Sequence, residues 1–276
     1  MLDKSKSDRF MRRLKKYNPL FPDQYLDPSF TLPAMLVITD GNSRRDIDVC
    51  VGAIGWHSVQ NGLEVLHLYE EAVQTSGLEF IPSARRDAIY YVDHFNPKRF
   101  INIESIFDVA HEERLAELKH IAHALGAIRC TIKISESNVS TNRRAANKKL
   151  SAGKKHLGLE TKTDAFAEAD SQNHRYGSIV AEFEGSHEAV RPTLKWFKQH
   201  DSMTRLIDMR CNNIHSNSIK RETIEISGSA QSTMSQKAAY TIDGAIQQLG
   251  AKGSYALESS AKQESNSKLI FHIEFP

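Results

Sequence analysis

The chain has 276 residues, 40% of them hydrophobic and 25% charged, which is a composition typical of globular proteins. The formal net charge of +2 at pH 7 is too small to indicate a general polyanion-binding protein, so such a function has to rest on local clusters. The three cysteines are widely spaced and form no CxxC pair, which argues against zinc and structural disulfides. Without a signal peptide or a long apolar run, we expect a protein that is cytoplasmic as synthesised.

Basic residues dominate the N-terminal stretch, MLDKSKSDRFMRRLKKY at 1–17. Its apolar residues recur at helical spacing, which predicts a short basic amphipathic helix that ends before Asn18-Pro19. Such a helix can be a solvated terminal helix, or it can contact anionic lipid or nucleic acid. The candidate membrane or polyanion contacts in it are Arg9, Arg12, Arg13, Lys15 and Lys16.

Short β-branched and aromatic runs follow between about residues 32 and 92. They are LPAMLVIT, DVCVGAIGW, LEVLHLY and AIYYV, and a helix can start after LEVLHLY in EEAVQT. Runs of this kind, interrupted by Gly, Asn and Pro, indicate an antiparallel meander. We therefore predict that residues 1–100 form a basic helix and an antiparallel α+β layer.

The remaining part, 101–276, begins with a helix-like stretch, IESIFDVAHEERLAELKHIAHALG. Five apolar residues share one face of it, and Gly126 provides a C-terminal stop; they are Leu115, Leu118, Ile121, Ala122 and Leu125. A second helical stretch is predicted to begin near Ser186, with Pro192 at an early helical position. It would form a helical spacer over 186–212.

Two similar phrases lie on either side of that spacer: TIKISESNVST at 131–141 and TIEISGSAQST at 223–233. Residues 130–184 placed on 222–276 without a gap share thirteen identities. Both stretches read as a strand, a helix and a β-hairpin, which indicates an internal repeat. We predict an α+β fold that contains an antiparallel sheet, packed helices and a duplicated strand, helix, β-hairpin unit at 128–185 and 218–276.

The helices of the two predicted units differ in charge. The second has one apolar stripe, closed by Gly250, which consists of Met234, Ala238, Ile242, Ala245 and Leu249. The first has a basic outer face, and it adds to the candidate membrane or polyanion contacts Arg143, Arg144, Lys148, Lys149, Lys154 and Lys155.

After each helix, apolar or small residues alternate with polar ones, as in GLETKTDAFAEAD at 158–170. A period of two predicts a two-faced strand, and a second alternating strand completes a hairpin in each unit. The apolar face of the hairpins comprises Leu159, Ala165, Ala167, Ile179 and Phe183 in the first unit, and Tyr255, Leu257, Phe271 and Ile273 in the second. This face can be the half-buried side of a core sheet. Its small residues bury little area, however, and also suit a surface that changes partners.

The segments rich in Ser, Thr, Ala and Gly resemble the paired membrane-inserting regions of the gasdermin and MACPF (perforin-like) pore formers. The resemblance covers roughly residues 128–276, and KGSYALESSAKQESNSKLIFHIEF at 252–275 is similar in texture to gasdermin hairpins. It implies a cytoplasmic effector, such as a toxin or an immune effector, that associates with anionic membranes on activation. There it would form a homo-oligomer and a β-hairpin pore, closed into a ring so that no peptide group stays unpaired in lipid.

Two alternatives remain open. The basic helix at 143–155 can bind nucleic acid, although it lacks the interleaved aromatic residues that stack on single strands. Alternatively, the duplicated units form a non-catalytic scaffold that self-assembles through its hairpins.

An enzyme is the less favoured interpretation. HEERLAELKHIAH places Glu117, His120 and His123 at ligand-like spacing with His111 on the other side of the helix, but a di-iron bundle needs two such motifs and further carboxylates. A solvated helical face explains these residues better than a metal site. GxSxG, P-loop and GxGxxG motifs are absent, so we expect neither a catalytic residue nor a cofactor.

Overall fold

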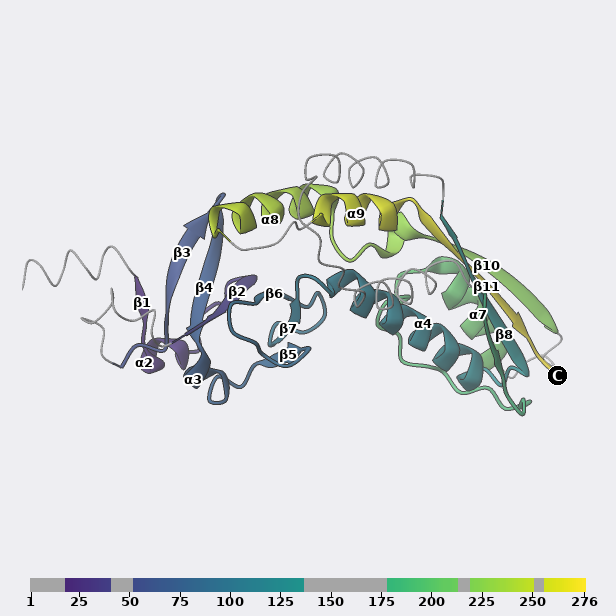
Figure 1. Ribbon diagram of the computed structural model, residues 1–276. Helices are drawn as coiled ribbons and strands as arrows, with labels where there is room; N and C mark the ends of the chain where they lie inside the picture. Colours follow the sequence, from purple (N-terminus) through teal and green to yellow (C-terminus); the bar gives the residue numbers. More distant parts are fainter. Residues whose placement is uncertain (1–17, 41–51, 137–177, 213–218, 251–255) are drawn as a thin grey trace, which may run out of the picture. The chain divides into compact units, whose positions relative to one another are not determined.

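The computed structural model describes residues 18–40, 52–136, 178–212, 219–250 and 256–276 (Figure 1). The predictions for the basic residues at 1–17 and 143–155, for Leu159, Ala165 and Ala167, and for Tyr255 lie outside these ranges. The chain divides into two compact units. The first combines Met1–Ala110 with Thr233–Ser259, and the second combines His111–Ser232 with Ser260–Pro276.

The first unit contains a seven-stranded sheet in the order β1-β3-β4-β2-β6-β7-β5. Its elements are β1 (Pro19–Leu20), α2 (Pro22–Tyr25), β2 (Met35–Thr39), β3 (Gly55–Gln60), β4 (Leu63–Tyr69), α3 (Glu70–Val73), β5 (Glu79–Ile81), β6 (Ile89–Val92), β7 (Arg99–Asn102) and α8 (Gln236–Gln248). Most of the predicted strands are confirmed, but the antiparallel meander is wrong, because β2 pairs with β4 in parallel and β5 pairs with β7 in parallel. Strands β2 and β4 are buried on both faces, as parallel strands usually are.

The remaining elements are α4 (Ile106–Ala124), β8 (Arg129–Glu136), β9 (Ser178–Glu182), α7 (Asp201–Cys211), β10 (Arg221–Ser227), η2 (Gly228–Gln231), α9 (Leu257–Ser265) and β11 (Ser267–Glu274). The second unit contains an antiparallel sheet in the order β10-β11-β8-β9, and Figure 1 shows β10, β11 and β8 side by side. Apolar residues at every second position turn one face of this sheet toward a core that α4 and α7 complete. The predicted α+β class is therefore confirmed.

Helix α4 has the apolar face that its spacing predicts, because Leu115, Leu118, Ile121, Ala122 and Leu125 are all buried in the core of the second unit. The helix ends at Ala124, and the predicted stop Gly126 follows it with a positive φ of 75°. A buried arginine, Arg210 of α7, donates hydrogen bonds to the carbonyl oxygen of Leu125 and lies over the ring of Phe275. This arginine therefore fixes the C-terminal end of α4.

The predicted helix from Ser186 is wrong over 186–200, because α7 begins only at Asp201. The backbone N–H groups of Lys195, Trp196 and Phe197 donate to the carboxylate of Glu117 on α4. These N–H groups are thus satisfied across the core without an intrahelical partner.

The predicted two-faced strand around Leu257 is also wrong, since residues 257–265 form helix α9. Leu257 and Ala261 are four residues apart and both are buried. The same residues therefore fit the apolar stripe of a helix as well as one face of a strand. The carboxylate of Asp243 on α8 accepts the backbone N–H groups of Leu257 and Glu258, which caps the first turn of α9.

No helix in the described parts of the chain combines the length and the apolar character that are needed to cross a membrane.

Candidate functional site: a four-stranded sheet with two inserted segments

Strands β8 and β10, which contain the start of the two similar phrases, pair in the same way with β9 and β11. In the β8–β9 pair Thr131 lies opposite Val180, and in the β10–β11 pair Thr223 lies opposite His272. Adding 92 to each residue number of a described β8–β9 pair gives a described β10–β11 pair, from Arg129–Glu182 to Lys133–Ser178. The two strand pairs therefore have equivalent registers.

Both connections between paired strands leave the sheet at one end. Ser267 lies opposite Glu136 and Lys268 lies opposite Ser227, while Ser178 is paired near the end of β8 with Lys133. Residues 137–177 thus join β8 to β9 from this end, and residues 228–266 join β10 to β11 from the same end. We call these stretches the first and second inserted segments.

The predicted apolar positions of the closing strands lie in the core or against it. Phe271 and Ile273 of β11 are fully buried, whereas Ile179 and Phe183 of the β9 region are partly buried against the same core. Leu257 is buried too, but in α9. These side chains stabilise the structure in its present form.

One arginine holds both ends of the second inserted segment. Arg114 of α4 is only 4% exposed and donates to the carbonyl oxygen of Gln231 at 3.0 Å and to the carboxylate of Glu264. The two ends also approach each other closely, since a Cβ at Gly228 would collide with the carbonyl oxygen of Glu264. The second inserted segment therefore starts and finishes at one buried charge.

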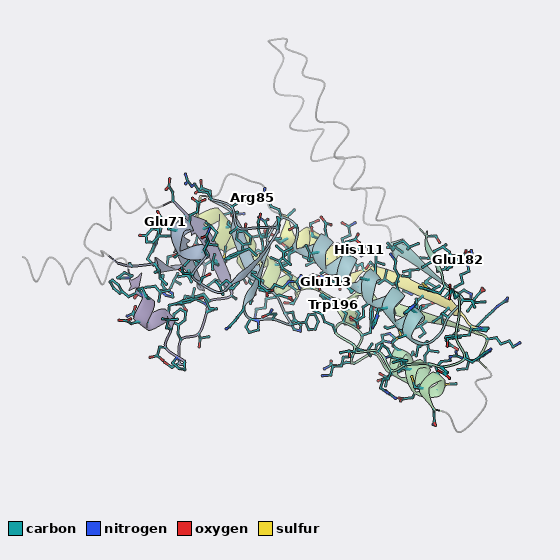
Figure 2. The ribbon with its side chains drawn as sticks, turned by 90° about the horizontal axis from the view of Figure 1, so that it is seen from below. Glu71, Arg85, His111, Glu113, Glu182 and Trp196 are labelled. Carbon is teal, nitrogen blue, oxygen red and sulfur yellow. The ribbon has the colours of Figure 1, made fainter. Side chains whose placement is uncertain are left out.

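A polar network adjoins that arginine. The guanidinium of Arg114 lies 4.9 Å from the ring centre of Trp196, and the indole N–H of Trp196 donates to Glu113 (Figure 2). The ammonium group of Lys195 lies 2.7 Å from the same carboxylate. Trp196 is thereby fixed as a platform for the buried guanidinium.

The histidine-rich face of α4 shows no arrangement of metal ligands. The carboxylate of Glu117 is engaged by backbone N–H groups, and His120 and His123 are exposed. Within the ranges that the structure describes, no three His, Cys, Asp or Glu side chains gather as a metal site requires.

In the first unit, α8 is held by the turn between β3 and β4. Asn61 and Gly62 have positive φ values of 48° and 79°, as in the tight hairpin turns that Asn-Gly favours. The backbone N–H of Asn61 donates to Gln248, its side chain donates to the carbonyl oxygen of Thr241, and the side chain packs against Gly244. Helix α8 thus docks through hydrogen bonds and one close approach at a glycine.

A histidine pairs with a serine on the β3–β4 ladder. Nε2 of His67 lies 2.8 Å from Oγ of Ser58, and the imidazole stacks on Trp56 at 4.5 Å between ring centres. Burial and the nearby His57 lower the pKa of His67 from 6.5 to about 4. His67 is therefore neutral at pH 7 and acts as a partner within the sheet.

Two cysteines lie among the described residues, both in the second unit, and neither is an activated thiol. Cys130 is buried in β8 and burial raises the pKa of its thiol, while Cys211 is partly buried and its pKa is raised for the same reason. A thiolate nucleophile requires the opposite shift.

Sequence reasoning missed Arg114, although a signal for it exists. Arg114, Leu118, Ile121 and Leu125 recur at spacings of four, three and four residues, so the arginine lies on the buried stripe of α4. A charge on such a stripe needs a buried partner. The partner could not be found from the sequence, because Glu264 lies 150 residues away.

Comparisons with protein-family models, with curated proteins and with solved structures found no match to this chain.

Proposed function

We propose that the protein assembles on anionic membranes and inserts two β-hairpins, made from its two inserted segments, to form a pore. One observation carries the proposal: both segments leave the same end of an antiparallel sheet, each between two neighbouring strands. Strands β8, β9, β10 and β11 can therefore lengthen into hairpins without any change in their pairing. Each segment is long enough for two strands of about nine to eleven residues, the length that spans a bilayer.

The register of β10 and β11 supports the hairpin made from the second segment. Continued beyond Ser227, it places Met234 opposite Ala261 and Ala238 opposite Leu257. Opposite residues share a face of the sheet. In the proposed hairpin, Leu257 and Ala261 of one strand would therefore lie on the same face as Met234 and Ala238 of the other strand.

The sequence of α8 has a helical pattern, but its apolar and polar residues also alternate approximately as in a two-faced strand. Ala238, Tyr240, Ile242 and Ile246 would point to one side of an extended strand, together with Gly244. Lys237, Thr241, Asp243 and Gln247 would point to the other side. A strand that alternates in this way suits lipid on one face and water on the other.

The first segment follows the same rule of parity. In the register of β8 and β9, Leu159, Ala165 and Ala167 would share a face with Ile179. We propose that the two strand pairs and their segments are a duplication, for which the equivalent registers are the support. The basic residues at 1–17 and 143–155 would bind anionic head groups, so that insertion depends on anionic lipid.

A pair of neighbouring substitutions tests this proposal. Tyr240 is 65% exposed on α8, so Tyr240→Asp leaves the folded structure nearly unchanged, but it puts a charge on the lipid-facing side of the proposed strand. Dye release from anionic liposomes is expected to fall about three- to tenfold, because a carboxylate on the lipid-facing side of a barrel strand is destabilising, although by less than the about 2 to 4 kcal/mol that Arg or Lys costs at the bilayer midplane.

The matched control is Thr241→Asp. It introduces the same charge one residue further along the same helix, but on the opposite face of the proposed strand. Its dye release should remain close to that of the unchanged protein. An equal loss of dye release in both variants would contradict the proposal. The proposal would also be contradicted if the unchanged protein at micromolar concentration left the liposomes intact.

A further inference from the structure

A row of alternating charges crosses the open face of the four-stranded sheet. Pairing places the row on consecutive strands β10, β11, β8 and β9, in the order Arg221, Glu274, Arg129 and Glu182. The guanidinium of Arg221 lies 3.9 Å from the carboxylate of Glu274, and Arg129 lies 3.9 Å from Glu182. The four side chains share one face of the sheet, because each lies opposite the next. This face points away from the core, since Ile273 and Phe275 beside Glu274 and Cys130 beside Arg129 are buried.

The two ends of this row carry opposite charges. Strands β9 and β10 are the two outer strands of the sheet. Glu182, which Figure 2 labels, lies on β9, and Arg221 lies on β10. The side chains of Glu182 and Arg221 are 75% and 74% exposed. Among the described residues, each outer strand pairs with a strand on one side only, so its other side offers backbone N–H and C=O groups.

We infer that the partner of these edges is a second copy of this chain, with β9 of one copy paired to β10 of the next. The inference rests on the proposed function in that it names how the copies join. Strands β9 and β10 run in opposite directions, because three antiparallel pairings separate them. Pairing between copies therefore continues the antiparallel sheet.

Charge complementarity fixes the register of this contact. When Glu182 of one copy lies beside Arg221 of the next, the alternating row continues across the junction with no like charges in contact. In the same register, Val180, two residues before Glu182, lies beside Thr223, two residues after Arg221. Main-chain hydrogen bonds would supply most of the attraction, and the charges would select the head-to-tail register.

Cysteine cross-linking tests the contact directly. In the full-length variant with Val180→Cys and Thr223→Cys, mild oxidation on anionic liposomes should give a ladder of disulfide-linked dimers and higher species. The two cysteines of one chain are three strand spacings apart, about 14 Å, whereas a disulfide needs Cα atoms within about 7 Å. Each single variant has only one of the two cysteines at every junction and should give no ladder.

Charge reversal in that double-cysteine background adds a second readout. Glu182→Arg alone places two arginines at each junction and Arg221→Glu alone places two glutamates there, so each should reduce the linked species about three- to tenfold. In a one-to-one mixture every junction between unlike variants is again complementary. The mixture should therefore restore the ladder, an outcome that a folding defect in either variant cannot produce.

The outcomes separate this inference from the proposed function. A ladder without dye release upholds the edge contact and overturns the pore. Dye release without a ladder, or a mixture that fails to restore it, overturns the edge contact while the pore stands. Absence of both overturns both.

Discussion

A single buried guanidinium, that of Arg114, is bonded to the start and to the finish of the second inserted segment. Glu264 is itself only 10% exposed, so the pair is shielded from water. Breaking a buried pair by removing one partner costs much more than the pair contributes, because the other charge stays buried without compensation. Arg114 is therefore well placed to keep the segment in its helical form.

Replacing Arg114 by methionine, which is similar in length and uncharged, should lower the free energy of unfolding by about 3 to 5 kcal/mol. Urea denaturation measures this loss, and hydrogen exchange should quicken over residues 228–266 before it quickens elsewhere. The double variant Arg114→Met, Glu264→Met removes both charges and should recover most of the loss. A double variant as unstable as the single one would contradict this account of Arg114.

His67 should make stability depend on pH. The unfolded chain binds a proton on this residue below its ordinary pKa of 6.5, whereas the folded protein binds it only below about 4. Between these values the unfolded state holds more protons, so the free energy of unfolding rises with pH from about 4 to 6.5 and is lost as the pH falls. The contribution is at most about 3 kcal/mol.

Urea denaturation at pH 4.5 and pH 7.5 tests this dependence. His67→Phe keeps a ring stacked on Trp56 and removes the titrating group, so its stability should differ less between the two pH values than that of the unchanged protein. The same difference in both proteins would assign the dependence to other groups.

At the scale of elements, some segments could be predicted from the sequence and others could not. Helix α4 and strand β11 have apolar residues with one clear period, and the residues predicted on their apolar faces are buried. Strands β8 and β10 lie where the two similar phrases predict a strand. Segment 257–262 fits both periods, and the cap that Asp243 provides decides for the helix. Local sequence could not reveal this contact, because it depends on how α8 approaches α9.

The parallel pairing of β2 with β4 was missed for a similar reason. The runs LVI in β2 and VLHL in β4 have the composition of strands, but composition does not state the direction of a neighbour. The candidate site could be anticipated only as two similar strand-containing stretches. Their shared sheet, their common exit end and Arg114 all depend on contacts between residues far apart in sequence.

The docking of α8 allows a reversible test at this scale. A Cβ built on Gly244 lies 3.7 Å from Cβ of Asn61, a separation typical of disulfides. In the variant Asn61→Cys, Gly244→Cys, oxidation should tie α8 to the β3–β4 turn and suppress dye release, because the segment can no longer extend.

Reduction with dithiothreitol should restore the dye release. Oxidation should not change the dye release of either single variant. Undiminished release from the oxidised double variant, with the disulfide confirmed by mass spectrometry, would show that α8 stays in place during the activity.

At the scale of the whole molecule, the near-neutral net charge of +2 means that attraction to an anionic surface has to come from local groups. The alternating row on the open sheet face is nearly neutral in itself, since it contains two arginines and two glutamates. In the proposed assembly, this row would therefore align copies, while the basic segments would bind lipid. The two tasks fall to different residues and can be altered separately.

The strand count of the sheet has a consequence for growth. Each copy adds four strands that alternate in direction, so the total number of strands is always even. A ring with any number of copies can therefore close with antiparallel pairing throughout. Ring size would then follow from the angle between neighbouring copies and not from strand arithmetic. An arc that has not yet closed would always end in one acidic and one basic edge, so its two tips would attract each other.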